Sequence, residues 1–373
     1  MAGDSDRKLN SDAAETRAAR SESDTRLPAI SGSGMSRREA MLQLLRLGGM
    51  AAGTAGAAFW LSERSSRPMA GPPEEARRDH RVAANSELPQ MTVVYFPTDE
   101  SVQQAARDGE PRELARQALE SLGGIRRFIS GGDSVVLKPN IAWDRTPEQA
   151  ANTNPELVAE VVRQCREAGA KRVIVTDVSC NEPRRCFARS GIEAAARAEG
   201  AEVMLPDPQL FREVDLGGVV LKTWPVFAPF LDADKVINLP IAKHHMLTGA
   251  TLGMKNWYGI LGGERNRLHQ QIHQSLVDLA SFMLPTLTLM DCYRVLLRNG
   301  PTGGNLEDVA LKKTLVAGTD PVAVDAYVAK GYWNLNPEQV PYLQMAAARG
   351  LGSAEFDKLA VKVVPMAAKG DGS

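Results

Sequence analysis

The stretch PELVAEVVRQCREAGAKRVIVTD, residues 155–177, predicts a helix followed at once by a strand. Its first part is amphipathic, begins with Pro155 in the first helical turn, and ends at Gly169. The following KRVIVTD is an apolar, β-branched run, which is typical of a strand buried on both faces. A helix that leads directly into such a strand indicates a parallel α/β sheet.

The same alternation continues on both sides of this stretch. Strand-like segments occupy residues 91–96, 133–140, 201–205, 234–240, 287–297 and 313–318, and helix-like segments occupy residues 111–122, 192–200, 267–284 and 321–330. Residues 211–224 contain a Gly-Gly pair between two strand-like runs, which predicts a hairpin. We therefore expect an α/β fold with a mainly parallel sheet, helices covering both of its faces, and a small hairpin insertion.

Composition supports one soluble globular domain preceded by a less ordered region. The 373 residues are 43% hydrophobic and 24% charged, and a net charge of −1 gives no basic excess for binding nucleic acid. Residues 1–34 have few large apolar side chains and are predicted to be disordered. Residues 62–90 are predicted to be a linker, and residues 91–373 a single α/β domain.

Residues 35–61 resemble a twin-arginine export signal, because Arg37-Arg38 precedes a moderately apolar, Gly/Ala-rich stretch at 47–61. The alternatives are a short membrane anchor and a buried helix, although the stretch is short for a spanning helix. This pattern predicts the twin-arginine translocase as a partner and a periplasmic or other extracytoplasmic location. The signal could be cleaved, or it could remain as an anchor.

Polar residues follow five of the predicted strands. In parallel sheets, ligands bind beyond the carboxyl ends of the strands. A turn or helix cap explains any single polar strand end, but their joint occurrence favours a common cleft. We expect the following residues to meet at one edge of the sheet: Lys138, Asp177, Lys243, Asp291 and Asp320. Further polar residues near these strand ends are Asn140, His244, His245 and Asp325.

The segment KHHMLTGATLGMKNWYGILGG, residues 243–263, mixes polar groups, glycines and large apolar side chains. A helix from Thr248 would place Thr251 and Lys255 on one face, with Gly249 and Gly253 leaving a flat surface beside them. Lys255 and Asn256 would then offer a cation and an amide donor to a carboxylate, phosphate or carbonyl oxygen. The alternative is a tightly packed helix pair in which Lys255 forms a structural ion pair.

Two histidines and four cysteines raise the question of metal binding. His269 and His273 are spaced as H-x-x-x-H, which on a helix would suit a divalent transition metal, with His245 or Asp291 as a third ligand. Exposed helical histidines without a metal are the alternative. There is no C-x-x-C pair, hence no iron–sulfur motif. Cys180 and Cys186 could form a disulfide or stay unpaired.

Five blocks resemble, in order, those of the domain of unknown function 362 family: VVLKPNIAW, TNPELVAEVV, VINLPIAKHHMLTGATLGMKNWYG, DCYRVLLRNGPTGG and GTDPVAVDAYVA. The resemblance covers about residues 134–331. It implies a family core at Lys138, Asn140, Asn154, His245, Lys255, Asn256, Asp291, Asp320 and Asp325. Many relatives carry an iron–sulfur cysteine segment that this chain lacks, so electron transfer by this chain itself is not expected, and a redox partner protein is one candidate partner.

Two functions fit this pattern. The first is an exported enzyme for a small anionic or carbonyl-containing substrate, in which lysine and asparagine side chains bind oxygens while His245 and Asp291 move protons, with or without a metal. The second is a periplasmic binding or accessory protein for an oxyanion or metal-containing ligand. No nucleophile elbow, P-loop or dinucleotide fingerprint is present in the sequence.

Overall fold

A central ten-stranded sheet organises the part of the chain that the computed structural model describes, residues 78–97 and 106–367. Eight strands lie in the order β14 (Val361–Pro365), β2 (Met91–Tyr95), β13 (Val309–Gly318), β12 (Leu287–Leu296), β8 (Lys235–Leu239), β3 (Ser134–Pro139), β4 (Arg172–Val175) and β5 (Glu202–Val203). Only β13 runs antiparallel to its two neighbours in this row. The predicted mainly parallel sheet is confirmed.

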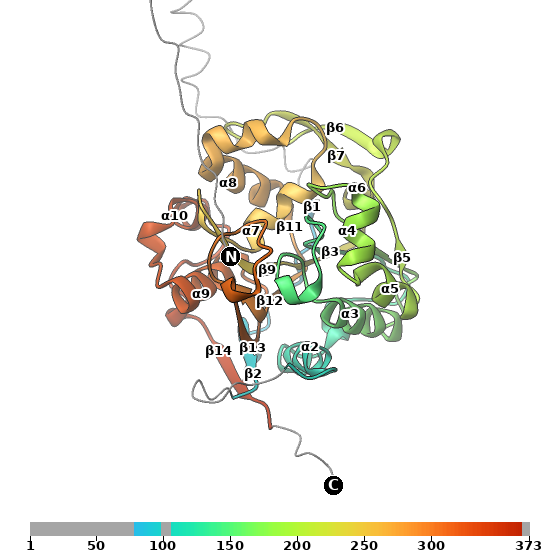
Figure 1. Cartoon of the computed structure of the whole chain (residues 1–373), viewed down its shortest axis with the longest axis vertical. Helices are drawn as coiled ribbons and strands as arrows, with labels where there is room; N and C mark the ends of the chain where they lie inside the picture. Colours follow the sequence, from blue (N-terminus) through green and yellow to red (C-terminus); the bar gives the residue numbers. More distant parts are fainter. Residues whose placement is uncertain (1–77, 98–105, 368–373) are drawn as a thin grey trace, which may run out of the picture. The chain divides into compact units, whose positions relative to one another are not determined.

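Helices cover both faces of this sheet, as predicted (Figure 1). One face packs against α2 (Glu110–Ser121), α3 (Pro155–Glu167), α4 (Pro183–Arg189) and α5 (Ile192–Ala198). The other packs against α6 (Ala228–Asp232), α7 (Gly253–Asn256), α8 (Ile272–Phe282), α9 (Pro321–Trp333) and α10 (Pro341–Ala348). Successive side chains of β3 point to opposite faces of the sheet. Val135 and Leu137 pack in the core under α2–α5, and Val136 packs in the core on the other face.

Smaller elements complete the described structure. The predicted hairpin is present as the antiparallel pair β6 (Phe211–Asp215) and β7 (Thr223–Phe227). Short 3₁₀ helices are η2 (Ile125–Arg127), η3 (Pro147–Gln149), η4 (Pro208–Leu210), η5 (Trp257–Ile260), η6 (Arg265–Gln271), η7 (Leu306–Asp308), η8 (Pro337–Gln339) and η9 (Phe356–Lys358).

The end of the predicted linker is built into this fold. Strand β1 (Arg78–Asp79) pairs in parallel with β11 (Met283–Leu284), and the His80 ring bonds the Asp234 carbonyl at 3.1 Å. Residues 78–90 therefore differ from a free linker. The predicted disordered extension (1–34) and export signal (35–61) lie outside the described residues.

The order of the strands creates a place for a ligand. From β3 the chain moves outward to β4 and β5 and then returns to β8, on the opposite side of β3. The loops that follow β3 and β8 therefore diverge at this point, leaving a crevice beyond their carboxyl ends. The short segments after β8 close over it: β9 (Ile241–His245), β10 (Gly249–Thr251) and α7.

The predicted helix from Thr248 is wrong. Thr251 and Lys243 are paired across the antiparallel β9–β10 ladder, and the helix begins only at Gly253. Gly249 has a φ of 74°, a left-handed conformation that favours glycine and interrupts a right-handed helix. The apparent helical spacing of Thr251 and Lys255 therefore spans a strand and a helix.

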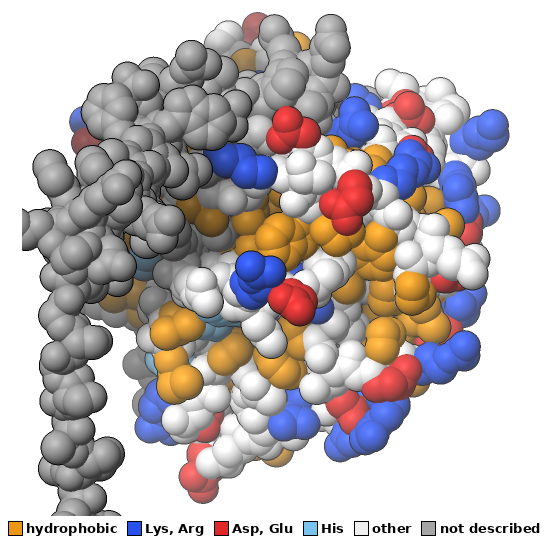
Figure 2. All heavy atoms as spheres, turned by 90° about the horizontal axis from the view of Figure 1, so that it is seen from above, with side chains coloured by type: hydrophobic (Ala, Val, Ile, Leu, Met, Phe, Trp, Pro, Cys, Tyr) orange, Lys and Arg blue, Asp and Glu red, His pale blue; other side chains and the backbone are white. Residues whose placement is uncertain are grey.

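None of the helices in the described ranges is long and apolar enough to cross a membrane. On the face shown in Figure 2, the described side chains of both charges are interspersed among hydrophobic ones, without a large area of one sign.

Candidate functional site

A cavity of about 520 Å³ lies beyond the carboxyl ends of β3 and β4, under β9, β10 and α7. It gathers seven of the twelve predicted site residues: Lys138, Asn140, Lys243, His245, Lys255, Asn256 and His269. Asp177 also lines it, as expected from its position after β4. The predicted strand ends therefore mark the position of the cavity, and the other five predicted site residues do not line it.

A buried ion pair forms the floor of the cavity. Lys138 at the end of β3 donates from Nζ to Asp177 Oδ1 at 2.6 Å, and both side chains are almost completely buried. The other Asp177 oxygen accepts the Ile141 N–H at 2.6 Å. Burial lowers the pKa of Lys138, and the adjacent Asp177 carboxylate opposes that shift. This pair fixes the loop after β3 against the loop after β4.

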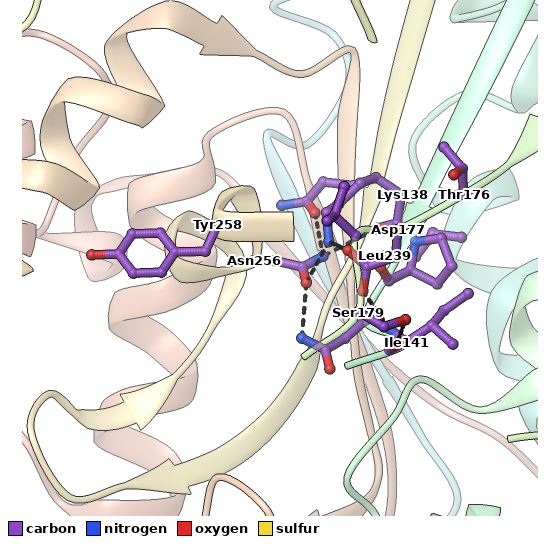
Figure 3. A network of polar contacts seen from close by, with 12 residues as sticks. Lys138, Ile141, Thr176, Asp177, Ser179, Leu239, Asn256 and Tyr258 are labelled. Atoms are coloured by element: carbon purple, nitrogen blue, oxygen red, sulfur yellow. Dashed lines mark hydrogen bonds and ion pairs between the residues drawn. The ribbon is translucent and has the colours of Figure 1, made fainter. Parts of the chain in front are cut away.

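Asn256 connects this pair to the rest of the site (Figure 3). Its Oδ1 accepts from Lys138 Nζ at 3.1 Å and from Asn140 Nδ2 at 3.0 Å. Its Nδ2 donates to the Lys138 carbonyl at 3.1 Å and to Asn238 Oδ1 at 2.8 Å. With both ends of the amide occupied, Asn256 holds α7 against β3 and β8, and it has little capacity left for a ligand.

Lys243 on β9 is a buried lysine without a carboxylate partner among the described residues. It donates to Asn140 Oδ1 at 2.9 Å and to the Ala151 carbonyl at 2.6 Å. Burial lowers the pKa of Lys243 to about 7, and the charges of Lys255 and Lys138 contribute to the shift. Near neutral pH this amine therefore exists in both protonation states.

Lys255 on α7 is the least satisfied cation of the cavity. Its side chain is 9% exposed, and its Nζ lies 4.7 Å from the centroid of the Tyr258 ring. It makes no hydrogen bond or ion pair with any residue that the structure describes. Burial lowers the pKa of Lys255 to about 8. The alternative of a structural ion pair therefore finds no support among the described residues, and the ammonium is available for an anion from outside.

His245 carries its proton on a defined nitrogen. The Leu247 N–H donates to His245 Nδ1 at 3.2 Å, so a neutral ring must hold its hydrogen on Nε2. Burial, followed by the charge of Lys255, lowers the pKa of His245 to about 3. Its ring stacks on His269, with centroids 6.3 Å apart. A neutral His245 ring would therefore offer its Nε2–H as a hydrogen-bond donor near neutral pH.

Positive groups outnumber negative ones around the cavity. Arg265 is a further cation, and its guanidinium donates to the carbonyls of Val178 at 2.7 Å and Ser179 at 2.8 Å instead of to a carboxylate. The carboxylates that line the cavity are Asp177, which is paired with Lys138, and Glu264, whose side chain is 79% exposed. The remaining charge favours an anionic ligand.

Asp291 and Asn154 belong to a structural contact outside the cavity. Asp291 is buried and accepts from the backbone N–H groups of Asn154 at 2.8 Å and Tyr293 at 2.9 Å. Burial raises the pKa of Asp291 to about 6. The Asn154 side chain caps α3 through the Glu156 N–H. Neither residue lines the cavity, so the structure contradicts their predicted places in the site.

Asp320 and Asp325 also lie away from the cavity lining. Since β13 runs antiparallel to β12, its C-terminal end lies beside the N-terminal end of β12, away from the cavity. Asp320 follows this end of β13 and caps α9. Asp325 on α9 accepts the N–H groups of Gly253 at 2.8 Å and Met254 at 3.0 Å. It therefore holds the start of α7, the helix that presents Lys255. Burial raises the pKa of Asp325 to about 7.

The structure does not bring His269 and His273 together. His269 lies in η6 and stacks on His245, whereas His273 lies in α8 and stacks on Tyr342. The described residues contain no group of three or more His, Cys, Asp or Glu side chains that could hold a metal ion. Cys180 and Cys186 are both free, the first exposed and the second buried.

The blocks that build this cavity also identify the family. A model described as "Domain of unknown function (DUF362)" matches residues 135–330, more than half of the chain. This chain belongs to the DUF362 family. The predicted family resemblance is confirmed, and the match includes the strand ends and α7 around the cavity.

Among known relatives, this DUF362 protein is similar to the "Thylakoid-associated protein sll1697" of Synechocystis sp. The two are 29% identical over 252 residues, which is 64% of this chain and 74% of that protein.

Similarity to solved structures is weaker. The lactate racemase apoprotein of Thermoanaerobacterium thermosaccharolyticum matches with a TM-score of 0.36 and 12% identity over 64% of this chain. A Thermotoga maritima protein matches with a TM-score of 0.32 and 12% identity, also over 64%. This chain spans only 56% and 58% of those two structures.

Several lining residues were not predicted as site residues. Arg265 and Tyr258 lie in 3₁₀ segments that the sequence did not distinguish from the surrounding helix and loop patterns. Gly259 lies so close to the floor that a Cβ there would be 1.8 Å from Asp177 Oδ1. The glycines of the segment 243–263 were the available signal, and Gly259 is the one that lies against the buried ion pair.

Proposed function

We propose that this DUF362 protein is an enzyme that binds a small carboxylate or similar carbonyl-containing anion in the cavity and catalyses a proton transfer on it. The observation that carries the proposal is Lys255, a buried ammonium without a hydrogen-bonding or ionic partner among the described residues. Leaving a buried cation unpaired costs free energy, and an anionic ligand would recover it.

Each neighbouring group has a role that its geometry supports. Lys255 would bind the carboxylate, and the Nε2–H of His245 would donate to a carbonyl oxygen as negative charge develops there. Lys243, with a pKa of about 7, would accept or return the proton. Lys138 bonds Asp177 and Asn256, and Asn256 also bonds Asn140 and Asn238, so Lys138 and Asn256 would support the site without binding the ligand.

Lys255→Met is expected to weaken binding of a small carboxylate by about 1.5–3 kcal/mol, roughly 10- to 150-fold in Kd. Pyruvate, oxalate, malonate and inorganic phosphate titrated by calorimetry provide the measurement. The variant should unfold at the same or a higher temperature than wild type, because it removes an unpaired buried cation. Lys362→Met, at an exposed position on β14, is the matched control and should bind normally. A loss of stability with unchanged binding would instead identify Lys255 as a structural residue.

Binding is expected to weaken as the pH rises through about 7 to 8, because Lys243 and then Lys255 lose the protons that attract the anion. If binding requires one protonated lysine, the affinity falls by up to about tenfold per pH unit above the pKa of that lysine.

The stability of the unliganded protein should also depend on pH. The pKa of Lys255 lies below its usual 10.5, so burying this ammonium lowers the free energy of unfolding below about pH 8, and this cost disappears as the pH rises toward 10.5. The stability advantage of Lys255→Met should shrink over the same window. A flat binding profile would contradict this role for the lysines.

A binding protein is the alternative, favoured by the fixed donor network around Asn140 and Asn256. The two functions differ in proton exchange. An enzyme of the proposed type should exchange the methyl protons of pyruvate for deuterium, whereas a binding protein should hold pyruvate without exchange.

We further propose that the chain is exported, supported by the Arg37-Arg38 pair before the apolar stretch at 47–61. Replacing both arginines with lysine should leave the protein in the cytoplasm, as measured by fractionation and immunoblotting. Equal amounts of variant and wild type in the cell envelope would refute export by the twin-arginine route.

A further inference from the structure

We propose that Cys180 is a nucleophile of this cavity, adding reversibly to the carbonyl carbon of a small 2-oxo carboxylate. This inference rests on the proposed function, because Lys255 would bind the carboxylate of the same molecule. Nothing in the family match or in the names of the relatives assigns a role to this thiol.

Cys180 is placed in the cavity by a well-fixed loop that follows β4. Its N–H donates to the Ala142 carbonyl at 2.9 Å. The preceding Ser179 donates from Oγ to the Ile141 carbonyl at 2.6 Å, and its own carbonyl accepts from Arg265 at 2.8 Å. Figure 3 shows Ser179 and Ile141 side by side next to the Lys138–Asp177 pair. The loop therefore holds the backbone of Cys180 in position at the cavity before a ligand binds.

Cys180 differs from the other three cysteines in its access to solvent. Cys165, Cys186 and Cys292 are buried, and Cys180 alone of the four is exposed and lines the cavity. Burial raises the pKa of the Cys165 thiol to about 12 and that of Cys186 to about 11. These three buried thiols should therefore react little with alkylating reagents, and they serve as internal controls when the reactivity of Cys180 is measured.

The cations of the cavity favour an anionic reactant beside Cys180. Cys180 lines the same cavity as the buried amines of Lys138, Lys243 and Lys255. Lys255 provides an independent indication of a ligand, since it is nine-tenths buried, has no described hydrogen-bonding partner, and lines the same cavity. A cysteine beside several cations is the environment in which thiols become nucleophilic.

The proposed step is balanced without an oxidant or a further reactant. The Cys180 sulfur forms a bond to the carbonyl carbon, the C=O double bond becomes a single bond, and the carbonyl oxygen takes up the proton that the thiol loses. The product is a hemithioketal. The Nε2–H of His245 lies in the same cavity and would stabilise the oxygen during addition.

Alkylation of the full-length protein tests the site. Iodoacetate carries a carboxylate and iodoacetamide does not, while both transfer a carbon to sulfur and release iodide. In the folded protein, the iodoacetate-to-iodoacetamide rate ratio at Cys180, measured by peptide mass spectrometry, should exceed the ratio in denaturant by about tenfold or more. Lys255→Met should remove most of this preference, pyruvate should protect Cys180, and the other three cysteines should stay unmodified. An unchanged ratio would overturn the inference.

A second measurement separates this inference from the proposed function. With [2-¹³C]pyruvate, wild type should give a tetrahedral carbon signal that Cys180→Ser lacks, although the variant still binds pyruvate by calorimetry. Binding without a tetrahedral signal or an alkylation preference would overturn the role of Cys180 and leave the anion site intact. Failure of wild type to bind any of the carboxylates would reject both proposals.

Discussion

Asp177→Asn is expected to lower the free energy of unfolding by about 3–5 kcal/mol, the usual cost of removing one partner from a buried ion pair. Lys138 would keep its buried ammonium while losing the carboxylate 2.6 Å away. The Ile141 N–H would also lose its charged acceptor. Chemical denaturation of wild type and variant measures the difference in the free energy of unfolding, provided that both proteins show the same m-value.

An exposed ion pair provides the control for this prediction. Arg212 and Asp232 are also within hydrogen-bonding distance, but their side chains are more than half exposed. Asp232→Asn should therefore cost less than about 1 kcal/mol. If Asp177→Asn cost no more than Asp232→Asn, the buried pair would not be the structural base of the cavity.

Asp325→Ala is expected to destabilise the protein by about 2–5 kcal/mol and to weaken carboxylate binding as well. The substitution leaves the buried N–H groups of Gly253 and Met254 without an acceptor, each at a cost of roughly 1–3 kcal/mol. These groups begin α7, so Lys255 would lose its fixed position even though Asp325 does not line the cavity. Thermal unfolding and calorimetric titration of the folded variant test the two effects.

Asp320→Ala is the matched control for Asp325→Ala. Asp320 also accepts several backbone N–H groups, from Val322, Ala323 and Ser353, but it lies at the opposite edge of the sheet. Its loss should lower stability while the folded protein binds carboxylates normally. Equal binding by both variants would show that α7 does not depend on Asp325 for its position.

The fold could be predicted from sequence because strand and helix patterns alternate cleanly. Lys138, Asp177 and Lys243 could also be placed from the sequence, because they follow or lie near parallel strands around the switch point. Asp320 could not, because no local pattern reveals that β13 runs antiparallel to its neighbours. Strand direction is set by tertiary pairing, which short-range periodicity does not encode.

The details of the site depend on contacts between distant segments. Gly259 resembles an ordinary loop glycine in the sequence, yet a Cβ there would lie 1.8 Å from Asp177 Oδ1 and 2.5 Å from Lys138 Nζ. Similarly, Gly253 leaves room for the Asp325 carboxylate, since a Cβ there would lie 2.8 Å from Asp325 Oδ1. Lys255 was predicted to bind an anion, but only the structure reveals that its ammonium lies against Tyr258 without a described ionic partner.

A crystal structure of the protein soaked with oxalate is the most direct test of the central claim, that the cavity beside Lys255 binds a small carboxylate. We expect oxalate in the cavity, with one oxygen about 2.7–2.9 Å from Lys255 Nζ, as in other charge-assisted hydrogen bonds. A second oxygen should accept a hydrogen bond from His245 Nε2. Oxalate bound only elsewhere on the protein, with Lys255 still unpaired at saturating concentration, would show that the cavity is not a carboxylate site.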